Sequence, residues 1–504
     1  MNIAIRIENA ARSSPDKVAI LFEEQEITYQ ALNACASIYA NLFLRSGVIK
    51  GDRVALFLPN SPEFIFAYYG ALKLGAIVVS VNVMLKKDEV DYTISDSNPV
   101  LILTTQNLGK ILTNKDIKDQ RRILFVENIG LDNFIDTDSH VDARTLTRDT
   151  PAAIIYSSGT TGFPKGILLS HENISSNTST TVTTCGIEEK DILLLSLPLF
   201  HCFGQNFIMN SCFLAKATLV LQRRFSPEEV MHLISRQSVT MVFGVPTIFI
   251  NFLEKNAPLE NFSGVRYFFT AGAHMPEEVS RRWYEKYGKN IYEGYGLTES
   301  SPFATYNHSK MYVFGSVGAP IENVEIKIVD AESKELEPNK WGEILIKGPN
   351  VMLGYWNNFE ATQDALSEGW LRTGDIGFLN ESGYLYIRDR LKDMIITSGF
   401  NVYSVEVENI IYLHPSVREV AVFGVPDPIK IEAVAAAVVC KEGINLTESE
   451  VLNFCREKIA AYKVPKFIVF VDDLPKNAIG KVLKNVLRQN FSREFDFVEK
   501  SHTG

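Results

Sequence analysis

The sequence contains few cysteines and lacks a long apolar run. Its six cysteines are scattered along 504 residues, and none of them forms a CxxC pair. This excludes a disulfide framework and a thiolate zinc site, and we expect the cysteines to be reduced. The most apolar stretch, residues 67–85, is interrupted by Lys73, Ser80 and Asn82. Because a membrane-spanning helix needs about 20 continuous apolar residues, we expect no transmembrane segment.

Positive charge is also scarce. The chain carries 50 Lys and Arg against 60 Asp and Glu, for a net charge of -10. Neutralisation of phosphates provides most of the non-specific affinity for nucleic acid, so this balance argues against a nucleic-acid-binding protein. A small anionic ligand is still compatible with it, since helix N-termini and a few local cations can hold one. Residues 1–17 alternate apolar and charged side chains, unlike a signal peptide, and we expect a cytoplasmic protein.

The pattern of apolar residues predicts an α/β fold. Helical spacing and short apolar runs alternate along the first 150 residues or so, which favours mainly parallel sheets flanked by helices. The helices are predicted at residues 29–46 and 63–74, and the strands at 53–58, 76–83, 100–104 and 123–126. Further strands are predicted at 192–197, 218–221, 241–245 and 267–270. Between residues 315 and 387 the strands lie closer together with glycine turns, which predicts a β-rich subdomain.

A charge cluster, RDRLKD at residues 388–393, stands between two apolar segments. After it, strand and helix signals alternate afresh to the end of the chain. We interpret it as a linker between a large N-terminal domain, residues 1–390, and a small α+β domain, residues 391–504. From charge alone, an ordinary surface turn explains the cluster equally well.

The richest motif is YSSGTTGFPKG at residues 156–166, which lies between two apolar runs. Glycines let successive backbone N–H groups converge on an anion, and the hydroxyls and Lys165 add donors and positive charge. The motif therefore predicts a polyphosphate-binding loop. It does not fit the P-loop pattern, and taken alone a loop of this composition is more often only a loop.

Three further motifs suggest a nucleotide site. In YEGYGLTE, residues 292–299, the glycines let a flat ligand approach the backbone and Tyr295 offers a ring for stacking, while Glu299 could hold Mg²⁺. In WLRTGDIG, residues 370–377, Asp375 could accept both hydroxyls of a ribose. In LPKNAIGKVLK, residues 474–484, Lys481 could deliver a cation to a phosphate. Each has an ordinary alternative: a strand–turn–helix capped by Thr298, a turn aspartate, and a solvated basic surface.

Together and in this order, the four motifs resemble those of the adenylate-forming superfamily, and most closely those of fatty acyl-CoA ligases. The resemblance runs from about residue 15 to about residue 487. It implies a mobile C-terminal domain that swings about Lys392 and carries the catalytic Lys481, together with ATP, Mg²⁺ and CoA as cofactors. The implied nucleotide-binding residues are Ser157, Ser158, Gly159, Thr160, Thr161, Lys165, Ala271, Gly272, Ala273, Glu293, Gly294, Tyr295, Gly296, Asp375, Arg390 and Lys481. Thr298 is implied as the contact to the α-phosphate and Glu299 as the Mg²⁺ ligand, and both count with Lys481 among the catalytic residues.

The segment LPLFHCFGQN, residues 197–206, bears on the substrate. His201 stands where amino-acid-activating relatives carry Asp, which argues against an α-amino acid. We include His201 among both the catalytic and the substrate-pocket residues. The remaining candidates for an acyl pocket are apolar: Phe203, Phe207, Val245, Phe249 and Pro302. These residues predict a fatty or other apolar carboxylic acid of unspecified length.

The acceptor of the acyl group stays open. The chain departs from the family pattern at Ser404, Ile396, Ile431 and Ile479, in the region where the thiol acceptor docks. CoA is the default acceptor, and the phosphopantetheine of an acyl carrier protein is the alternative. A non-catalytic protein that binds an acyl-nucleotide is a third hypothesis, against which the intact Lys481, Glu299 and Asp375 argue. The sequence does not indicate an oligomeric state.

Overall fold

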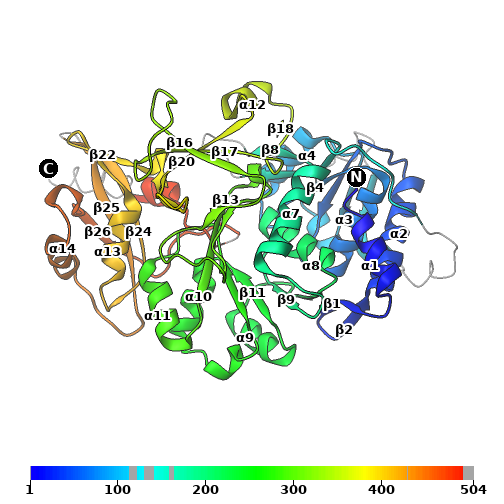
Figure 1. Ribbon diagram of the computed structural model, residues 1–504, viewed down its shortest axis with the longest axis horizontal. Coiled ribbons are helices and arrows are strands. Elements are labelled where there is room, and N and C mark those ends of the chain that lie inside the picture. The colour runs from blue at the N-terminus through cyan, green and yellow to red at the C-terminus, as the bar shows by residue number, and fades with distance from the viewer. Residues whose placement is uncertain are drawn as a thin grey trace.

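The computed structural model describes residues 2–112, 122–129, 141–157, 164–427, 430–478 and 480–491. Within these residues the strands form four sheets with helices packed around them (Figure 1). Two large sheets belong to the N-terminal region, a smaller antiparallel sheet follows, and the last sheet belongs to the C-terminal region. The architecture confirms the predicted α/β class and the predicted β-rich subdomain.

The first sheet has the strand order β18-β8-β7-β4-β3-β5-β6, and β3 to β7 within it are parallel neighbours. Its strands are β3 (Arg53–Phe57), β4 (Ile77–Ser80), β5 (Leu101–Thr104), β6 (Arg122–Phe125), β7 (Pro151–Ser157), β8 (Lys165–Ser170) and β18 (Gly354–Tyr355). The helical segments of this stretch of chain are α2 (Tyr29–Arg45), α3 (Pro62–Leu74), α4 (Lys87–Ser97), α5 (Gln106–Gly109) and η1 (Val126–Asn128). Sequence explains the limits of α3: the Ser61 side chain caps its first turn, and Gly75 ends it at φ 72°.

The second sheet has the order β15-β14-β13-β12-β11-β9-β10-β1-β2 and is parallel from β1 to β13. Its strands are β1 (Val18–Phe22), β2 (Gln25–Thr28), β9 (Ile192–Leu195), β10 (Thr218–Leu221), β11 (Met241–Gly244), β12 (Tyr267–Thr270), β13 (Ile291–Gly296), β14 (Phe303–Tyr306) and β15 (Ala319–Pro320). The helical segments of this region are α1 (Ile5–Ser13), α7 (His171–Cys185), η3 (Phe203–Met209), α8 (Asn210–Leu214), α9 (Pro227–Arg236), α10 (Pro246–Glu254), η4 (Leu259–Phe262), α11 (Glu277–Tyr287) and η5 (Thr298–Ser300).

The third sheet is antiparallel and forms the β-rich subdomain, with the order β16-β17-β20-β19 and β21 beside β20. Its elements are β16 (Glu325–Val329), β17 (Gly342–Lys347), α12 (Phe359–Ala365), β19 (Leu366–Ser367), β20 (Trp370–Leu379) and β21 (Leu385–Arg390). Strand β20 carries Asp375, which pairs in register with Arg390 at the end of β21.

The C-terminal sheet has the order β23-β22-β25-β24, with β26 beside β25. Its elements are η6 (Leu391–Asp393), β22 (Ile395–Thr397), β23 (Phe400–Val402), α13 (Ser404–Tyr412), β24 (Val417–Asp427), β25 (Ile431–Cys440), α14 (Glu448–Arg456), η7 (Ala461–Lys463) and β26 (Phe467–Phe470). The buried residues of the main N-terminal core extend to Leu385, and those of the C-terminal cores begin at Ile395. The change of core lies at the charge cluster, where the sequence predicts a domain boundary; that boundary stays a prediction.

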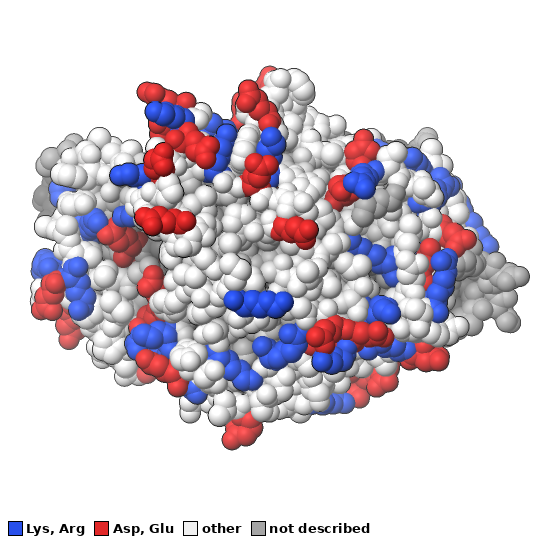
Figure 2. Space-filling view, viewed as in Figure 1, with Lys and Arg blue, Asp and Glu red and all other residues white. Residues whose placement is uncertain are grey.

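In the described ranges, no helix combines the length and the apolar character that crossing a bilayer requires. Figure 2 shows acidic and basic side chains mixed over one face of the molecule, without an extended area of a single sign among its described residues. Such a face does not generate the single-sign field that steers large polyanions.

Candidate active site

The candidate residues meet at one edge of the second sheet. Parallel strands end on the same side of a sheet, and ligands of open α/β sheets bind beyond those carboxyl ends. The segments that follow β9, β11, β12 and β13 therefore converge there. They carry these predicted residues: His201 and Phe203 after β9, Val245 after β11, Ala271, Gly272 and Ala273 after β12, and Thr298 and Glu299 after β13.

Asp375 lies opposite β13 and is held from two sides. The Tyr295 hydroxyl donates a hydrogen bond of 2.7 Å to its Oδ2. Arg390 forms an ion pair of 3.1 Å with its Oδ1 through Nε. The Asp375 backbone N–H also donates to Thr373 Oγ1 at 3.0 Å within β20, so Asp375 lies on a strand and not in the turn that the sequence suggested. The structure thus brings three sequence-predicted residues together, although Tyr295 serves here as a hydrogen-bond donor as well as a ring.

Glu299 and Lys165 are linked by Tyr355, which the sequence analysis did not select. The Tyr355 hydroxyl donates to Glu299 Oε1 at 2.9 Å, and the Lys165 ammonium lies 4.9 Å from the centre of the Tyr355 ring. Tyr355 reaches both because β18 pairs with β8, which places it opposite Ile167. Only this pairing of distant segments reveals the residue, since nothing in its local sequence distinguishes it.

The phosphate-loop prediction is only partly covered by the structure. Ser157 ends β7 and pairs with Lys165 at the start of β8, and the two strands are antiparallel. Ser158, Gly159, Thr160 and Thr161 lie outside the described residues. The two flanking residues, with Glu299 and Tyr355, define the side of the site where polyphosphate is predicted.

Lys481 reaches the same site from the C-terminal region. Asn477 holds its loop, accepting from the Lys481 backbone N–H through Oδ1 at 2.9 Å and donating to the Lys481 carbonyl oxygen at 2.9 Å. Gly480, at φ 85°, lies so close to α10 that an added Cβ would stand 2.9 Å from Thr247 Oγ1. A side chain at this position would therefore push the loop away from the N-terminal region.

Electrostatics also connect these groups. Burial and the neighbouring Arg390 lower the pKa of Lys481 to about 8, while Asp375 opposes the shift. Burial and the charge of Lys481 lower the pKa of His201 to about 4, so His201 is neutral near pH 7. Burial raises the pKa of Glu299. Burial and the negative charge of Glu277 raise the pKa of Glu293 to about 8. Clustered, strongly shifted groups of this kind are typical of functional sites.

Most of the predicted acyl-pocket residues lie near the candidate site, but Phe249 does not. Phe203 and Phe207 lie on η3 and contact Phe303, which follows Pro302. Val245 lies beside the Lys481 loop, 3.2 Å from a Cβ built on Gly480. Phe249 lies elsewhere, because it packs on α10 against Phe252, Phe268 and Trp283. The structure therefore does not bring Phe249 together with the other candidates.

A polar network at the predicted hinge also escaped the sequence analysis. Asp389 Oδ2 accepts hydrogen bonds from the backbone N–H and from Oγ of Ser404, both at 2.6 Å. Lys484 Nζ donates to Ser404 Oγ and forms an ion pair of 2.8 Å with Glu408. Proline, usual at position 404 in the family, has no N–H to donate. The network links residues on both sides of Lys392.

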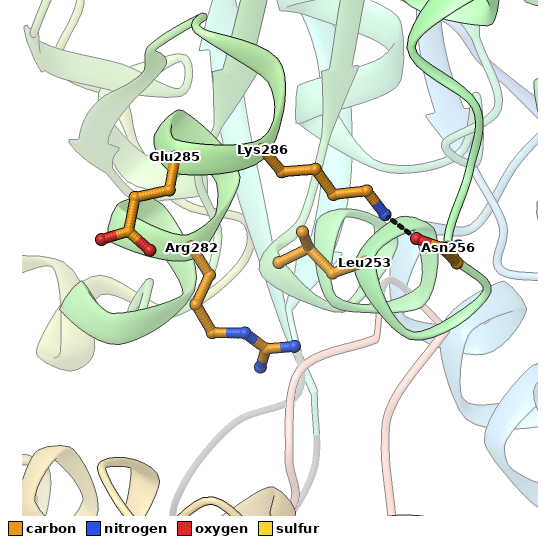
Figure 3. Close-up of a pocket in the computed structure, with 5 residues that line it drawn as sticks. All are labelled: Leu253, Asn256, Arg282, Glu285 and Lys286. Carbon is orange, nitrogen blue, oxygen red and sulfur yellow. Dashed lines mark hydrogen bonds between the residues drawn. The ribbon is translucent and has the colours of Figure 1, made fainter.

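A shallow surface cavity lies between α10 and α11, away from these groups. Figure 3 shows its lining, in which Lys286 donates to Asn256 Oδ1 at 2.7 Å beside Leu253, Arg282 and Glu285. The residues that converge on Lys481 do not line it, so we do not assign it to the candidate site.

Comparison with known proteins agrees with this geometry. The family model described as AMP-binding enzyme matches residues 7–356, and the model of the AMP-binding enzyme C-terminal domain matches residues 406–481. The chain is 35% identical over 97% of its length to the long-chain-fatty-acid–CoA ligase FadD13 of Mycobacterium tuberculosis, 99% of which is covered. The chain belongs to the AMP-binding enzyme family, which confirms the resemblance found in the sequence.

Solved structures support the fold and the arrangement of the N-terminal and C-terminal regions. ATP-bound MatB from Rhodopseudomonas palustris is 33% identical, with a TM-score of 0.91 over 97% of this chain and 99% of that one. The apo structure of the same protein gives a TM-score of 0.81. The anthranilate CoA ligase AuaEII in complex with anthranoyl-AMP is 29% identical, with a TM-score of 0.92 over 97% of each chain. The chain is thus more similar to the ATP-bound than to the apo form of MatB.

Proposed function

We propose that the chain is a cytoplasmic AMP-forming acyl-CoA synthetase, which converts an apolar carboxylic acid to an acyl-adenylate and then to a CoA thioester. The observation that carries the proposal is the approach of the Lys481 loop to the N-terminal region, where a Cβ added to Gly480 would stand 2.9 Å from Thr247 and 3.2 Å from Val245. The pKa shifts of Lys481 and His201 agree with this approach, since Arg390 and Asp375 act on Lys481 and Lys481 acts on His201. The names of the similar proteins, several of them CoA ligases, support the same activity.

The residues divide the binding of ATP among them. Asp375 accepts the ribose hydroxyls and keeps its place through Tyr295 and Arg390. The β7–β8 strand pair with Lys165 receives the pyrophosphate, and Thr298 contacts the α-phosphate. Glu299 fits Mg²⁺, since Tyr355 links its carboxylate to Lys165 at the predicted phosphate side, and Mg²⁺ is usually held by one or two carboxylates together with phosphates. When bound, the ion neutralises charge on the triphosphate.

Adenylation brings a carboxylate against a highly negative triphosphate. A carboxylate oxygen attacks the α-phosphorus, the bond to the bridging oxygen breaks, and pyrophosphate leaves. The Lys481 ammonium lies between the attacking carboxylate and the α-phosphate and stabilises the charge that develops there. His201, being neutral, adds no competing charge to that position.

The thiol then attacks the acyl carbonyl carbon and AMP leaves. Lys481 is no longer required there, and a rotation of the C-terminal domain about Lys392 clears space for the thiol. Both half-reactions then use one site with two arrangements of the domains.

One observation favours a carrier protein as the alternative acceptor. Phe400 and Ile431 on the C-terminal sheet are 53% and 66% exposed. Thr397 pairs with both Phe400 and Ile431, so these two exposed side chains lie on one face of the sheet. Apolar side chains gathered in this way at a surface are typical of contacts with another protein. A Phe400→Ser/Ile431→Ser variant that loses transfer to a carrier protein but retains transfer to CoA would support this acceptor.

The decisive experiment separates the two half-reactions. Exchange of labelled pyrophosphate into ATP is measured with a panel of carboxylic acids, and thioester formation is then scored with CoA and with holo carrier protein. We expect acid-dependent exchange followed by acyl-CoA formation. If no acid supports exchange, the proposed function is wrong; if exchange occurs and only the carrier protein is loaded, the acceptor alone is wrong.

A further inference from the structure

If the chain has the proposed function, one feature of its site determines which acids it accepts. A cluster of aromatic rings fills the space that adjoins the reacting groups. We call it the ring cluster, and it consists of Phe203, Phe207, Phe243, Phe269, Phe303 and Tyr306. All six side chains are buried.

The position of the reacting groups sets the direction in which an acyl group must extend. The nucleoside side of the site is taken by Asp375 and Arg390, and the phosphate side by Lys165 and Glu299. The acid carboxylate must lie beside Thr298 and Lys481, within about 3–3.5 Å of the α-phosphorus. The remaining direction leads towards η3, whose start is tied to this point because Cys202 Sγ lies 3.2 Å from Thr298 Oγ1.

The ring cluster begins at that place. Phe203 directly follows Cys202, and its ring centroid lies 5.3 Å from that of Phe303, which follows η5. Behind them, Phe207 forms the centre of the cluster. Its ring centroid lies 5.4 Å from that of Phe203, 5.5 Å from Phe243, 5.1 Å from Phe269, 4.6 Å from Phe303 and 5.7 Å from Tyr306. These separations are those of rings in contact.

The far side of the cluster is closed by α7. The Tyr306 hydroxyl lies 2.7 Å from Thr181 Oγ1, and the Tyr267 hydroxyl donates to Cys185 Sγ at 3.4 Å. The Phe269 ring also lies against the backbone of β13, where a Cβ added to Gly294 would meet Phe269 Cζ at 2.4 Å. A straight chain that passed the first rings would therefore meet further rings and then a packed helix.

We infer that the ring cluster closes the acyl side of the site, so that the enzyme activates compact carboxylic acids and rejects long straight-chain ones. Phe207 and Phe303 are the specificity-determining residues. Phe207 fills the centre of the space that a longer chain would need, and Phe303 narrows its entrance. The inferred preference for compact acids therefore differs from the long-chain substrates stated in the names of its relatives.

The test compares acids of increasing length, from acetate through butyrate, hexanoate and octanoate to palmitate, in the pyrophosphate-exchange assay. We expect the wild-type protein to give its highest kcat/KM with a short acid and little exchange with octanoate or palmitate. Phe207→Leu and Phe303→Leu remove ring atoms but keep an apolar side chain. Because each additional buried methylene is worth about fourfold, either variant should raise the octanoate-to-butyrate ratio about tenfold or more.

Phe268→Leu is the matched control. Phe268 neighbours Phe269 on β12, but successive side chains of a strand point to opposite faces. It packs against Phe249, Phe262 and Trp283 instead. It should therefore cost similar thermal stability without changing the chain-length ratio. Phe303→Ala, nearer the mouth of the cluster, serves if Phe207→Leu fails to fold.

The outcomes separate two failures. Equal wild-type activity with palmitate and butyrate would overturn the inference, as would folded Phe207→Leu and Phe303→Leu variants with the wild-type ratio. Both results leave the proposed adenylation intact. Absence of exchange with every acid would instead contradict the proposed function itself.

Discussion

The two sides of the candidate site are held in different ways. On the N-terminal side, Asp375 is fixed by Tyr295 and Arg390 and lies on a sheet strand. On the C-terminal side, Lys481 lies in a loop held by Asn477, and Gly480 permits its approach to α10. The difference fits a binding site that must stay preorganised for ATP and a cation that must arrive and leave.

Removing the mobile cation should have the largest effect. We expect Lys481→Ala to slow adenylation by about 10²–10³-fold, since a positioned charge that stabilises the transition state is lost. Thioester formation from preformed acyl-adenylate should be nearly unchanged, because that step proceeds without Lys481. Lys476→Ala is the control: it removes a nearby ammonium that pairs with Glu419 at 2.8 Å outside the site. Equal loss of both half-reactions in Lys481→Ala would contradict the contrast between the two sides.

A substitution on the N-terminal side, at Asp375, should have a smaller effect, which falls on the binding of ATP. Asp375→Asn keeps the shape of the side chain but leaves Arg390 without its anion and weakens the predicted ribose contact. Hydrogen bonds to charged groups contribute about 1.5–3 kcal/mol, so the KM for ATP should rise roughly 10–100-fold. Asp330→Asn is the control, because Asp330 Oδ1 accepts the backbone N–H groups of Glu332 and Lys334 in the turn after β16, away from Asp375. An unchanged KM for ATP in Asp375→Asn would remove Asp375 from the nucleotide site.

The charge of Lys481 should also be visible in the pH profile. Because the pKa of Lys481 is lowered to about 8, the cation is present below that pH and is lost above it. We expect kcat/KM for adenylation to fall above about pH 8, by about tenfold per pH unit. Lys481→Arg should abolish this fall, since arginine keeps its charge.

Glu293 complicates that measurement because its pKa is also raised to about 8. Glu293→Gln removes this second titration and should leave the fall above pH 8 in place. A pH profile that becomes flat in Glu293→Gln but still falls in Lys481→Arg would show that Glu293 causes the loss of activity. It would contradict the role of the Lys481 charge.

The sequence predicted regular elements better than the contacts between them. The helix expected at residues 29–46 is α2, Tyr29–Arg45, and the strand expected at 53–58 is β3, Arg53–Phe57, because apolar spacing and glycine ends act locally. The sequence could not show that Phe249 packs against Phe268 and Trp283, since that depends on which face of the sheet α10 covers. Tyr355 was missed for a related reason: strand pairing over nearly 190 residues brings it to Lys165.

The smallest expected effect concerns the Ser404 network, which joins the two sides across Lys392. Ser404→Ala keeps the backbone N–H that Asp389 accepts but removes the hydroxyl that Asp389 and Lys484 share. Loss of hydrogen bonds of about 1 kcal/mol should disfavour the arrangement that places Lys481 in the site. Adenylation should therefore slow about fivefold, with little change in thioester formation from preformed adenylate. Ser382→Ala, at an exposed turn before β21, should change neither rate. A Ser404→Ala variant that slowed both half-reactions equally would show that the network stabilises the fold without favouring either arrangement of the domains.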